Sequence, residues 1–596
     1  MNKPDKRPIS GQDIPEFQGE FFDSDRRMTS IGSGSIGAKA SGLAFIHDVL
    51  RSKLSAQDSA QIQISIPSLT VIRTDVFDAF LKRNALNDLA YSESANDVIA
   101  HAFQKALLPA EILGDLRRLI EKVHTPLAIR SSSMLEDALN HPFAGVYVTK
   151  MIPNNQPSPD IRFQKLMEAI KLVYASTFSK SAKDYLKAIR RSPYDEKMAV
   201  IIQEVVGALH ADRFYPNVSG IAKSYNFYPI GRSRPEDGMA SLALGLGKTI
   251  VDGGTCWTYS PAYPGISTPV ASAGELIEQT QNEFWAVHMG KPPAYDPIQE
   301  TEYLVRLNLS DAEADGTLSH IASVYDVQED RISTGLDREG PRVLNFAGLL
   351  GLKRVPLNDV ISSLLSISQQ ALGAPVEIEF AATFNPHRFG FLQIRPMVVP
   401  GDKIDIAEEE LKGENVLLAS ENVLGNGIIE TIRDIVYVKP QEFEAQYSPR
   451  IALELETVNR GLLEKGRPYL LIGFGRWGSS DPWGGIPVEW GQVCGAKVIV
   501  EATRPTMNFE LSQGSHFFHN LSSFEVCYFC VPYSGEYAID WEWLSRQEGE
   551  QETRFVRHVV LQTPLQVKVD GRSGRGVIRA PRSDGGKHHK HHGQIC

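Results

Sequence analysis

One segment in the first quarter of the chain combines residue types that suit phosphate chemistry. The apolar run 126–129 leads into Arg130 and three serines, followed closely by Glu136 and Asp137. A guanidinium, several hydroxyls and two carboxylates would together serve a polyphosphate and its metal ion. Ser133 and Glu136 also have the spacing of a capping box, which would begin a helix. At this point the segment leaves both interpretations open, a phosphate site and a capped helix start.

A glycine-rich loop lies upstream of this segment. Gly32, Gly34 and Gly37 form a G-x-G-x-x-G pattern, with Lys39 two residues later. A dinucleotide-binding fold requires a buried strand directly before this pattern, and the preceding FFDSDRRMTS is too polar for one. The loop instead predicts a helix start at which backbone amides and the Lys39 ammonium face phosphate. A plain helix N-terminus with a solvated lysine is the alternative.

A third candidate is a pair of alternating runs around Pro386. A hairpin centred there would place Glu379 opposite Gln393 and Glu377 opposite Arg395, with all four side chains on one face. Carboxylate and amide oxygens beside a guanidinium predict a magnesium site next to a phosphate clamp. The alternative is a cross-strand salt bridge on a solvated sheet face.

The elements around these candidates have the rhythm of an α/β (α+β) fold. Residues 60–125 alternate short apolar runs with helical patterns, and 161–190 repeat apolar residues at intervals of three and four. A buried strand is expected at 198–207, where Gln203 and Glu204 form a polar pair near its end.

Composition narrows the class of protein. A net charge of −11 argues against nucleic acid as a partner. No apolar run reaches the ~20 residues of a membrane span, and the N-terminal residues lack the apolar centre of a signal peptide. The five cysteines are too few and scattered for a disulfide framework. We therefore expect a cytoplasmic protein with reduced thiols.

Taken in order, roughly the first 400 residues resemble the nucleotide-binding domain of the phosphoenolpyruvate synthase and pyruvate phosphate dikinase family, a divergent ATP-grasp fold. The matching blocks are the glycine loop with Lys39, the Arg130 segment with Phe143-Ala144-Gly145, the Gln203 strand, Ser219-Gly220-Ile221, the Gly245-Leu246-Gly247 turn and the stretch from Glu377 to Pro396.

The resemblance implies ATP and Mg²⁺ as cofactors and gives roles to single residues. Lys39 and Arg130 would contact the ATP phosphates, and Arg395 would reach the terminal phosphate. Glu379 and Gln393 would hold magnesium. Positioning and charge neutralisation of this kind supply most of the catalysis in phosphoryl transfer.

The remaining cofactor-binding positions implied by the resemblance surround these residues. The strand end 203–205 would border the adenine, chiefly through its backbone. Together with Lys39, the cofactor-binding set is Gly34, Gly37, Ser131, Ser132, Gln203, Glu204, Val205 and Glu377.

Three departures separate the chain from the family pattern. Glu377 replaces a common Asp, and Lys248 stands where synthase members often have Glu, which reverses a charge near the cleft. No Thr-Ser-His-Ala-like block of the phosphohistidine domain is present. The sequence after residue 400 also lacks room for both that domain and a barrel of roughly 250 residues. The complete pyruvate reaction is therefore not expected from this chain.

The family resemblance, together with the composition of the segments on either side, implies several regions. These are an arm (1–28), an ATP-grasp domain (29–400) with lobes 29–235 and 236–400, a charged linker (401–414), a smaller α/β domain (415–580) and a histidine-rich disordered tail (581–596).

The C-terminal third contains two weaker candidates. The turn at 473–481, with Arg476, is an anion or acceptor site or else a tight structural turn. His516 is a speculative phosphoacceptor, for which a structural histidine is the simpler interpretation. Together with His519, Cys527 and Cys530 it also resembles a zinc pattern, but the cysteines belong to a predicted strand and would point to opposite faces.

Two functions follow from these observations. The first is an ATP- and Mg²⁺-dependent phosphotransferase of kinase or dikinase type. Its phosphate acceptor is an unidentified small molecule or protein that the C-terminal domain presents or docks. The second is an ATP-binding regulatory or scaffold protein without turnover. Neither nucleic acid nor a membrane is expected as a partner, and the oligomeric state is left open.

Overall fold

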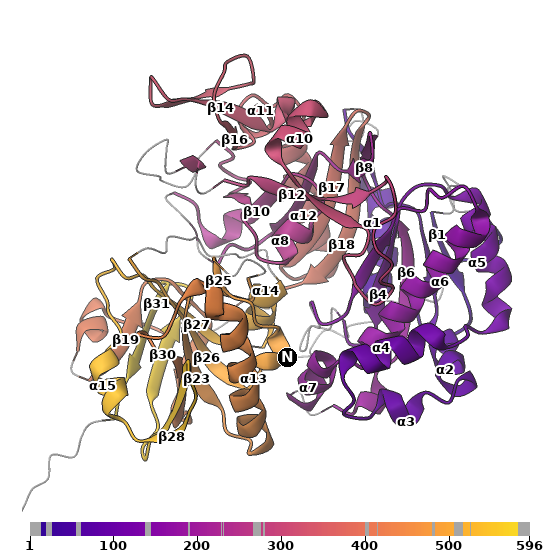
Figure 1. Cartoon of the computed structure of the whole chain (residues 1–596). Coiled ribbons are helices and arrows are strands. Elements are labelled where there is room, and N and C mark those ends of the chain that lie inside the picture. Colours follow the sequence, from indigo (N-terminus) through magenta and orange to yellow (C-terminus); the bar gives the residue numbers. More distant parts are fainter. Residues whose placement is uncertain are drawn as a thin grey trace, which may run out of the picture.

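The computed structural model of the chain is shown in Figure 1. It describes residues 14–19, 27–54, 61–136, 145–188, 191–227, 229, 232–265, 276–277, 280–397, 399, 404–413, 415–479, 483–505, 516–524 and 526–581.

The first lobe is built on a mixed five-stranded sheet. In spatial order its strands are β1 (Met28–Ile31), β3 (Leu69–Ile72), β6 (Met198–Glu204), β4 (Leu127–Ser133) and β5 (Thr149–Ile152). Around it lie α2 (Thr74–Arg83), α3 (Asn87–Ala90), α4 (Asn96–Lys105), α5 (Ala110–Lys122), α6 (Pro159–Ser176) and α7 (Lys180–Ala188) (Figure 1). Each of these helices buries the face that carries its apolar residues. In α5 the buried residues are Ile112, Leu116, Leu119 and Ile120, which recur at helical spacing.

Strand β1 corrects one sequence expectation. It is fully buried and lies directly before the glycine loop, whereas the polar sequence before that loop predicts no buried strand. The polar side chains are satisfied internally: the hydroxyls of Thr29 and Thr70 are 2.8 Å apart, and Ser30 donates to the carbonyl of Ile14 at 3.4 Å. This polar strand can be buried because its hydroxyl groups have hydrogen-bond partners inside the protein.

The second lobe is built on a six-stranded sheet. Its spatial order is β11 (Trp257–Tyr259), β10 (Met239–Ala243), β9 (Val218–Lys223), β17 (Val376–Phe384), β18 (His387–Pro396) and β2 (Gln63–Ser65). Helices α1 (Gly37–Lys53) and α12 (Leu357–Leu372) contact each other and its central strands. Strands β2 and β9 precede residue 236, so the strand pairing does not follow the expected lobe division there.

Two smaller sheets complete this part of the chain. One contains β13 (Leu304–Asn308), β12 (Glu283–His288), β8 (Arg213–Tyr215) and β7 (Ala208–His210). The other contains β15 (Arg331–Thr334), β14 (Ala322–Asp326) and β16 (Arg342–Leu344). The short helices among them are α8 (Lys248–Val251), α10 (Leu309–Ala314) and α11 (Ala347–Leu350).

The C-terminal unit contains a seven-stranded sheet and a four-stranded sheet packed face to face. The first is β20 (Val423–Leu424), β27 (Cys527–Val531), β26 (Ala496–Ala502), β23 (Tyr469–Phe474), β22 (Asp434–Val438), β29 (Val556–Val560) and β28 (Gly549–Glu552). The second is β19 (Val416–Ser420), β31 (Arg575–Arg579), β30 (Gln566–Asp570) and β21 (Asn426–Ile429). Helix α13 (Ser448–Glu464) covers the other face of the larger sheet; α14 (His516–Ser523) and α15 (Trp541–Arg546) lie nearer its ends (Figure 1).

Parts of the expected arm and linker pack against the folded units. Phe17 is buried, and its amide donates to the carbonyl of Ser30 at 2.9 Å. In the linker, a 3₁₀ turn at Glu408–Lys412 places the carboxylate of Glu410 2.9 Å from Nζ of Lys568. The tail beyond residue 581 lies outside the described residues.

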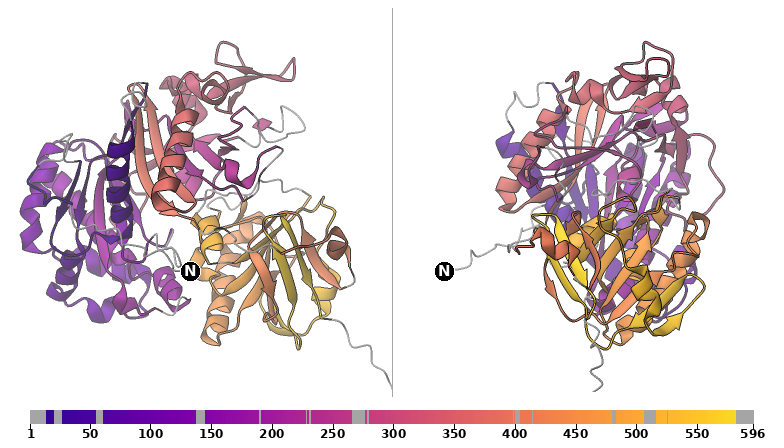
Figure 2. Two further views of the ribbon diagram at one scale, coloured as in Figure 1. Left: turned by 180° about the vertical axis from the view of Figure 1, so that it is seen from behind. Right: turned by 90° about the vertical axis from the view of Figure 1, so that its left-hand side faces the viewer.

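The C-terminal unit contacts both lobes, as the views in Figure 2 also show. Against the first lobe, the rings of Tyr185 and Phe524 have centroids 5.2 Å apart, and Lys180 pairs with Glu456. Against the second, Phe518 of α14 stacks edge-on to Phe227 at 5.8 Å. One continuous apolar core runs through the first lobe and the C-terminal unit, so this arrangement is part of the fold.

Candidate functional site

A cavity of about 240 Å³ lies between the sheets of the two lobes. Residues from β4, β5 and β6 line it on one side, and residues from β17 and β18 line it on the other. Its walls include these residues, to which the sequence assigned ATP- or magnesium-binding roles: Lys39, Arg130, Gln203, Glu204, Val205, Glu379, Gln393 and Arg395.

Arg130 connects the two lobes across this cavity. One terminal nitrogen donates to Oε1 of Gln203 at 3.0 Å and to the carbonyl of Leu392 at 2.9 Å. The other donates to Oε1 of Gln393 at 2.7 Å and lies 3.7 Å from a carboxylate oxygen of Glu379. Neighbours from both sheets therefore fix the orientation of the guanidinium. A fixed, planar guanidinium is suited to bidentate contact with a phosphate group.

Lys39 approaches the same cavity from the first turn of α1. Its Nζ lies 2.7 Å from Oε1 of Glu136 and 3.2 Å from the hydroxyl of Ser131. Ser131 donates to the same carboxylate oxygen at 2.8 Å. A bound phosphate would compete with Glu136 for the ammonium, because both are anionic acceptors.

The reciprocal hydrogen bonds predicted for the capping box are present, but the described residues show no helix starting there, because Ser133 is the last residue of β4 and residues 134–136 form a bend and a turn. The amide of Ser133 donates to Oε2 of Glu136 at 2.8 Å, and the amide of Glu136 donates to the hydroxyl of Ser133 at 3.1 Å. Residues 137–144, which include Asp137 and the Phe143-Ala144 pair, lie outside the described residues. The segment therefore combines reciprocal capping bonds with residues that line the cavity.

Gly34, Gly37 and Ser132 contact the protein itself rather than the cavity. The amide of Gly34 donates to Oδ1 of Asp75 at 2.8 Å. Gly37 has φ of +74°, and a Cβ there would lie 1.7 Å from the carbonyl oxygen of Ser132. The Ser132 hydroxyl in turn accepts from the amide of Ala40 at 3.1 Å. These residues fix the start of α1 against β4, which places Lys39.

The hairpin register predicted from the sequence is confirmed. Glu377 pairs with Arg395 and Glu379 pairs with Gln393, with a bulge just after Glu379. The alternative of a solvated face is wrong, since Arg395 is only 2% exposed. The face is covered because it looks toward the other lobe and the C-terminal unit.

Glu377 lies behind the cavity and holds Arg395. Its Oε1 accepts from Nε of Arg395 at 2.6 Å, and its Oε2 lies 3.0 Å from Nζ of Lys223. Burial lowers the pKa of Lys223, and the Glu377 carboxylate opposes that shift. The ring of Phe518, from α14, lies 5.1 Å from the Lys223 ammonium. A buried row of contacts thus joins Arg395 to the C-terminal unit.

The donor set at Glu379 and Gln393 fits a magnesium ion bound together with phosphate. The Glu379 carboxylate lies 3.7 Å from Arg130 and 3.6 Å from Arg395. Mg²⁺ in phosphate sites is usually held by one or two carboxylates, with phosphate oxygens and waters as the other ligands. One carboxylate and one amide oxygen at the cavity wall satisfy that requirement.

The strand end at 203–205 has most of its polar groups engaged. The amide of Val205 donates to the carbonyl of Pro126 at 3.0 Å, and the Glu204 carboxylate accepts from both terminal nitrogens of Arg388 at 2.9 Å. The cavity wall nearby is apolar, with Ala128, Met151, Val206, Leu246 and Leu304. This end of the cavity suits the face of a base more than its polar edge.

Three further charged residues of the cavity were missed by sequence reasoning or left in doubt. Lys248 lies 2.9 Å from Oδ2 of Asp252, and Glu300 lines the same wall. Burial lowers the pKa of Lys248, but the carboxylates of Glu300 and Asp252 outweigh it, and the pKa lies above its usual value. The Lys248–Asp252 spacing of four was a usable signal; Glu300 is too distant in sequence to have been found.

Glu196, which lies beside the Arg130 segment, makes the stability of the fold depend on pH. It is 1% exposed, and burial, together with the neighbouring Glu136 carboxylate, raises the pKa of its carboxyl to about 8. The folded state therefore binds this proton more tightly than the unfolded state does. The contribution of the protonated carboxyl to folding stability is complete below 4.5, the ordinary pKa of glutamate, and is lost as the pH rises through about 8.

We expect Glu196→Gln to raise the first thermal unfolding transition by several degrees at pH 9 and to change it little at pH 4. The amide is neutral at both pH values, so no proton has to be lost from a buried site. Scanning calorimetry of both proteins between pH 4 and pH 9 tests this. Equal shifts at both ends of the range would contradict it.

The C-terminal candidates receive little support as chemical centres. His516 is the first residue of α14, and its side chain lies outside the described residues, as does that of His519. Cys527 is buried while Cys530 is partly exposed, as expected for strand residues three apart. Among the described residues, no metal-ligating cluster includes these cysteines.

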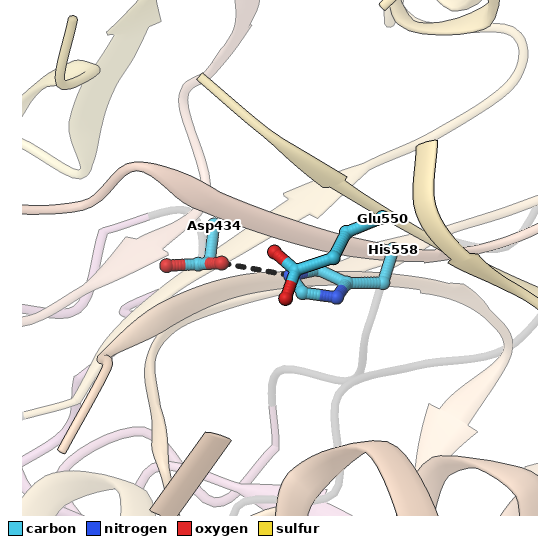
Figure 3. Close-up of side chains that lie close together, drawn as sticks. All are labelled: Asp434, Glu550 and His558. Atoms are coloured by element: carbon cyan, nitrogen blue, oxygen red, sulfur yellow. Dashed lines mark hydrogen bonds and ion pairs between the residues drawn. The ribbon is translucent and has the colours of Figure 1, made fainter. Parts of the chain in front are cut away.

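A different cluster lies at one edge of the C-terminal sheet (Figure 3). Asp434, Glu550 and His558 converge there, and Nε2 of His558 lies 2.7 Å from Oδ1 of Asp434. Arg467 already pairs with both carboxylates, at 2.9 Å in the case of Glu550. The cluster is best described as an ion-pair network that joins β22, β28 and β29.

A family model described as pyruvate phosphate dikinase, AMP/ATP-binding domain, matches residues 33–415. The chain belongs to this family. The AMP/ATP-binding domain contains all the described residues that line the cavity, and its fold is a mixed α/β fold. The match ends one residue before β19, so the C-terminal unit lies beyond the AMP/ATP-binding domain. No curated protein matches the chain. Among the described helices, none is both long and apolar enough to span a membrane.

Proposed function

We propose that the protein is an ATP- and Mg²⁺-dependent phosphotransferase. The observation that carries the proposal is the convergence of Lys39, Arg130 and Arg395 with Glu379 and Gln393 at one cavity of an AMP/ATP-binding domain. Cations and oxygen ligands at one end and an apolar wall at the other match the two ends of a nucleotide.

Each residue has a role that follows from its geometry. Lys39 and Arg130 bind and orient the phosphates, and Glu136 and Gln203 hold these two side chains in place. Arg395, fixed by Glu377, faces the phosphoryl group on which charge shifts during transfer. Magnesium, held by Glu379 and Gln393, would neutralise phosphate charge.

Product analysis tests the reaction type. The full chain is incubated with Mg²⁺ and ATP labelled separately at the β and γ positions, and the nucleotides are resolved. AMP supports dikinase-type chemistry, and ADP supports a simple kinase. Tight ATP binding with no turnover in the presence of candidate acceptors supports the alternative, a regulatory or scaffold protein. That alternative is motivated by Lys248, which stands where synthase members often have glutamate.

Glu379→Gln is expected to raise the Mg²⁺ concentration needed for half-maximal ATP binding by roughly 10-fold or more. The amide keeps the shape but removes the one carboxylate of the proposed pair, and it also leaves Arg130 and Arg395 without a shared counter-charge. Calorimetric titrations of ATP at several Mg²⁺ concentrations measure the shift. An unchanged dependence of ATP binding on Mg²⁺ would contradict the assignment of the metal site to Glu379.

A further inference from the structure

A second cavity, of about 300 Å³, lies between the AMP/ATP-binding domain and the C-terminal unit. It shares Gly145, Val251 and Asp252 with the nucleotide cavity, so the two spaces meet at one wall. A molecule in the second cavity would therefore lie directly beside a molecule bound in the nucleotide cavity.

The C-terminal side of this cavity follows the carboxyl end of a parallel strand, where ligands of α/β sheets usually bind. Gly478 and Ser479 follow the short strand β24 (Arg476–Trp477), which comes just after β23, and Gly478 has φ of +73° with Phe517 packed against it. Arg476 of β24 donates to the carbonyl of Gly253 at 3.1 Å. That bond holds β24 against the residue that follows Asp252.

The lining has a definite chemistry. Asp252 and Glu489 supply two carboxylates, and Ser479 and Asn520 supply a hydroxyl and an amide. Trp490 and Phe517 provide an apolar floor, with ring centroids 5.3 Å apart. Lysine and arginine are absent from its described lining residues.

An anionic acceptor such as pyruvate would meet the like charge of Glu489 in this cavity, while Asp252 is already paired with Lys248. A neutral molecule with several hydroxyls would not, because hydroxyls donate to carboxylates and amides while carbon-bound hydrogens pack on aromatic rings. The lining therefore favours a polyol or sugar over a carboxylic acid.

We propose that this cavity binds the phosphate acceptor and that the acceptor is a neutral polyol or sugar, an inference that rests on the proposed phosphotransferase function. An acceptor hydroxyl oxygen attacks the terminal phosphorus of ATP. The bond from that phosphorus to the bridging oxygen breaks, ADP leaves, and the hydroxyl proton passes to Asp252. Lys248, 2.9 Å from Asp252, orients that carboxylate.

The test measures ADP formation and phosphorylated product with myo-inositol, glucose and glycerol, and with pyruvate and lactate as anionic comparisons. We expect at least one of the three neutral compounds to be phosphorylated and the anions not to be. Asp252→Asn should lower the transfer rate by about 100-fold or more while the ATP Kd changes less than about threefold. Glu489→Gln should raise the acceptor KM about fivefold, with a smaller effect on kcat.

Glu93→Gln is a matched control, since Glu93 is an exposed carboxylate with a lysine partner in the first lobe. Phosphorylation of the anions alone, unaltered kinetics in Asp252→Asn, or ATP binding with no phosphorylated neutral compound would each overturn the acceptor site. Absence of ATP binding by the unaltered chain would instead overturn the proposed function and the acceptor site with it.

Discussion

Arg130→Ala is expected to weaken binding of Mg²⁺-ATP by about 100-fold or more. A guanidinium forms two charge-assisted bonds with phosphate, each worth about 1.5–3 kcal/mol, and a tenfold change in affinity corresponds to about 1.4 kcal/mol. Arg130 is also the residue that joins β4 to β18 through Leu392 and Gln393. Its removal therefore takes away a ligand contact and loosens the relation between the two lobes.

Calorimetry with a non-hydrolysable ATP analogue measures the effect, and Arg130→Lys separates the two causes. Lysine keeps the charge but cannot form the planar fork, so an intermediate loss of about tenfold is expected. Arg546→Ala is the control, since Arg546 forms an exposed pair with Glu542 on α15. Tight, unchanged analogue binding by folded Arg130→Ala protein would refute the phosphate assignment.

Local patterns were sufficient to predict much of the nucleotide cavity. Alternation around Pro386 gave the correct partners for Glu377 and Glu379, because strand residues face alternate sides and a tight hairpin sets the register. The spacing of Ser133 and Glu136 gave the reciprocal bonds now seen between them. In both cases the interacting residues are near in sequence or joined by one turn.

Contacts between residues far apart in the sequence could not be predicted from local patterns. Lys223 meets Glu377 only because β9 pairs with β17, which are more than 150 residues apart. Nothing in the local sequence of Lys223 indicates this pairing. The buried strand β1 was missed for a related reason, since the hydroxyl of Thr29 finds its partner on β3. Burial of a polar side chain is unfavourable unless it has a hydrogen-bond partner, and this partner is far away in the sequence.

The same long-range contacts connect the nucleotide cavity to the C-terminal unit. Phe518 of α14 lies against Lys223, which pairs with Glu377, which holds Arg395. Phe517, its neighbour on α14, lines the proposed acceptor cavity. A chain of direct contacts therefore runs from the helix that lines that cavity to Arg395.

Arg395→Ala is expected to lower the rate of phosphoryl transfer by about 100- to 1,000-fold, while the Kd for ATP changes less than about tenfold. In the proposed arrangement this difference follows from position, because Lys39 and Arg130 would still bind the phosphates and only the group facing the developing charge would be lost. Single-turnover transfer rates and analogue affinities are measured on the same protein. Equal losses of rate and affinity would show that Arg395 acts in ground-state binding instead.

Glu377→Gln provides the matched test of positioning. The amide accepts from Arg395 in place of the carboxylate, but the buried Arg395 and Lys223 then lack their shared counter-charge. We expect a fall in transfer rate smaller than that of Arg395→Ala, with ATP affinity nearly unchanged. Because loss of a buried carboxylate can also destabilise the fold, Lys223→Met in the Glu377→Gln background removes one of the two cations. Partial recovery of the rate in that double variant is expected if the excess charge displaces Arg395, and no recovery would contradict this account.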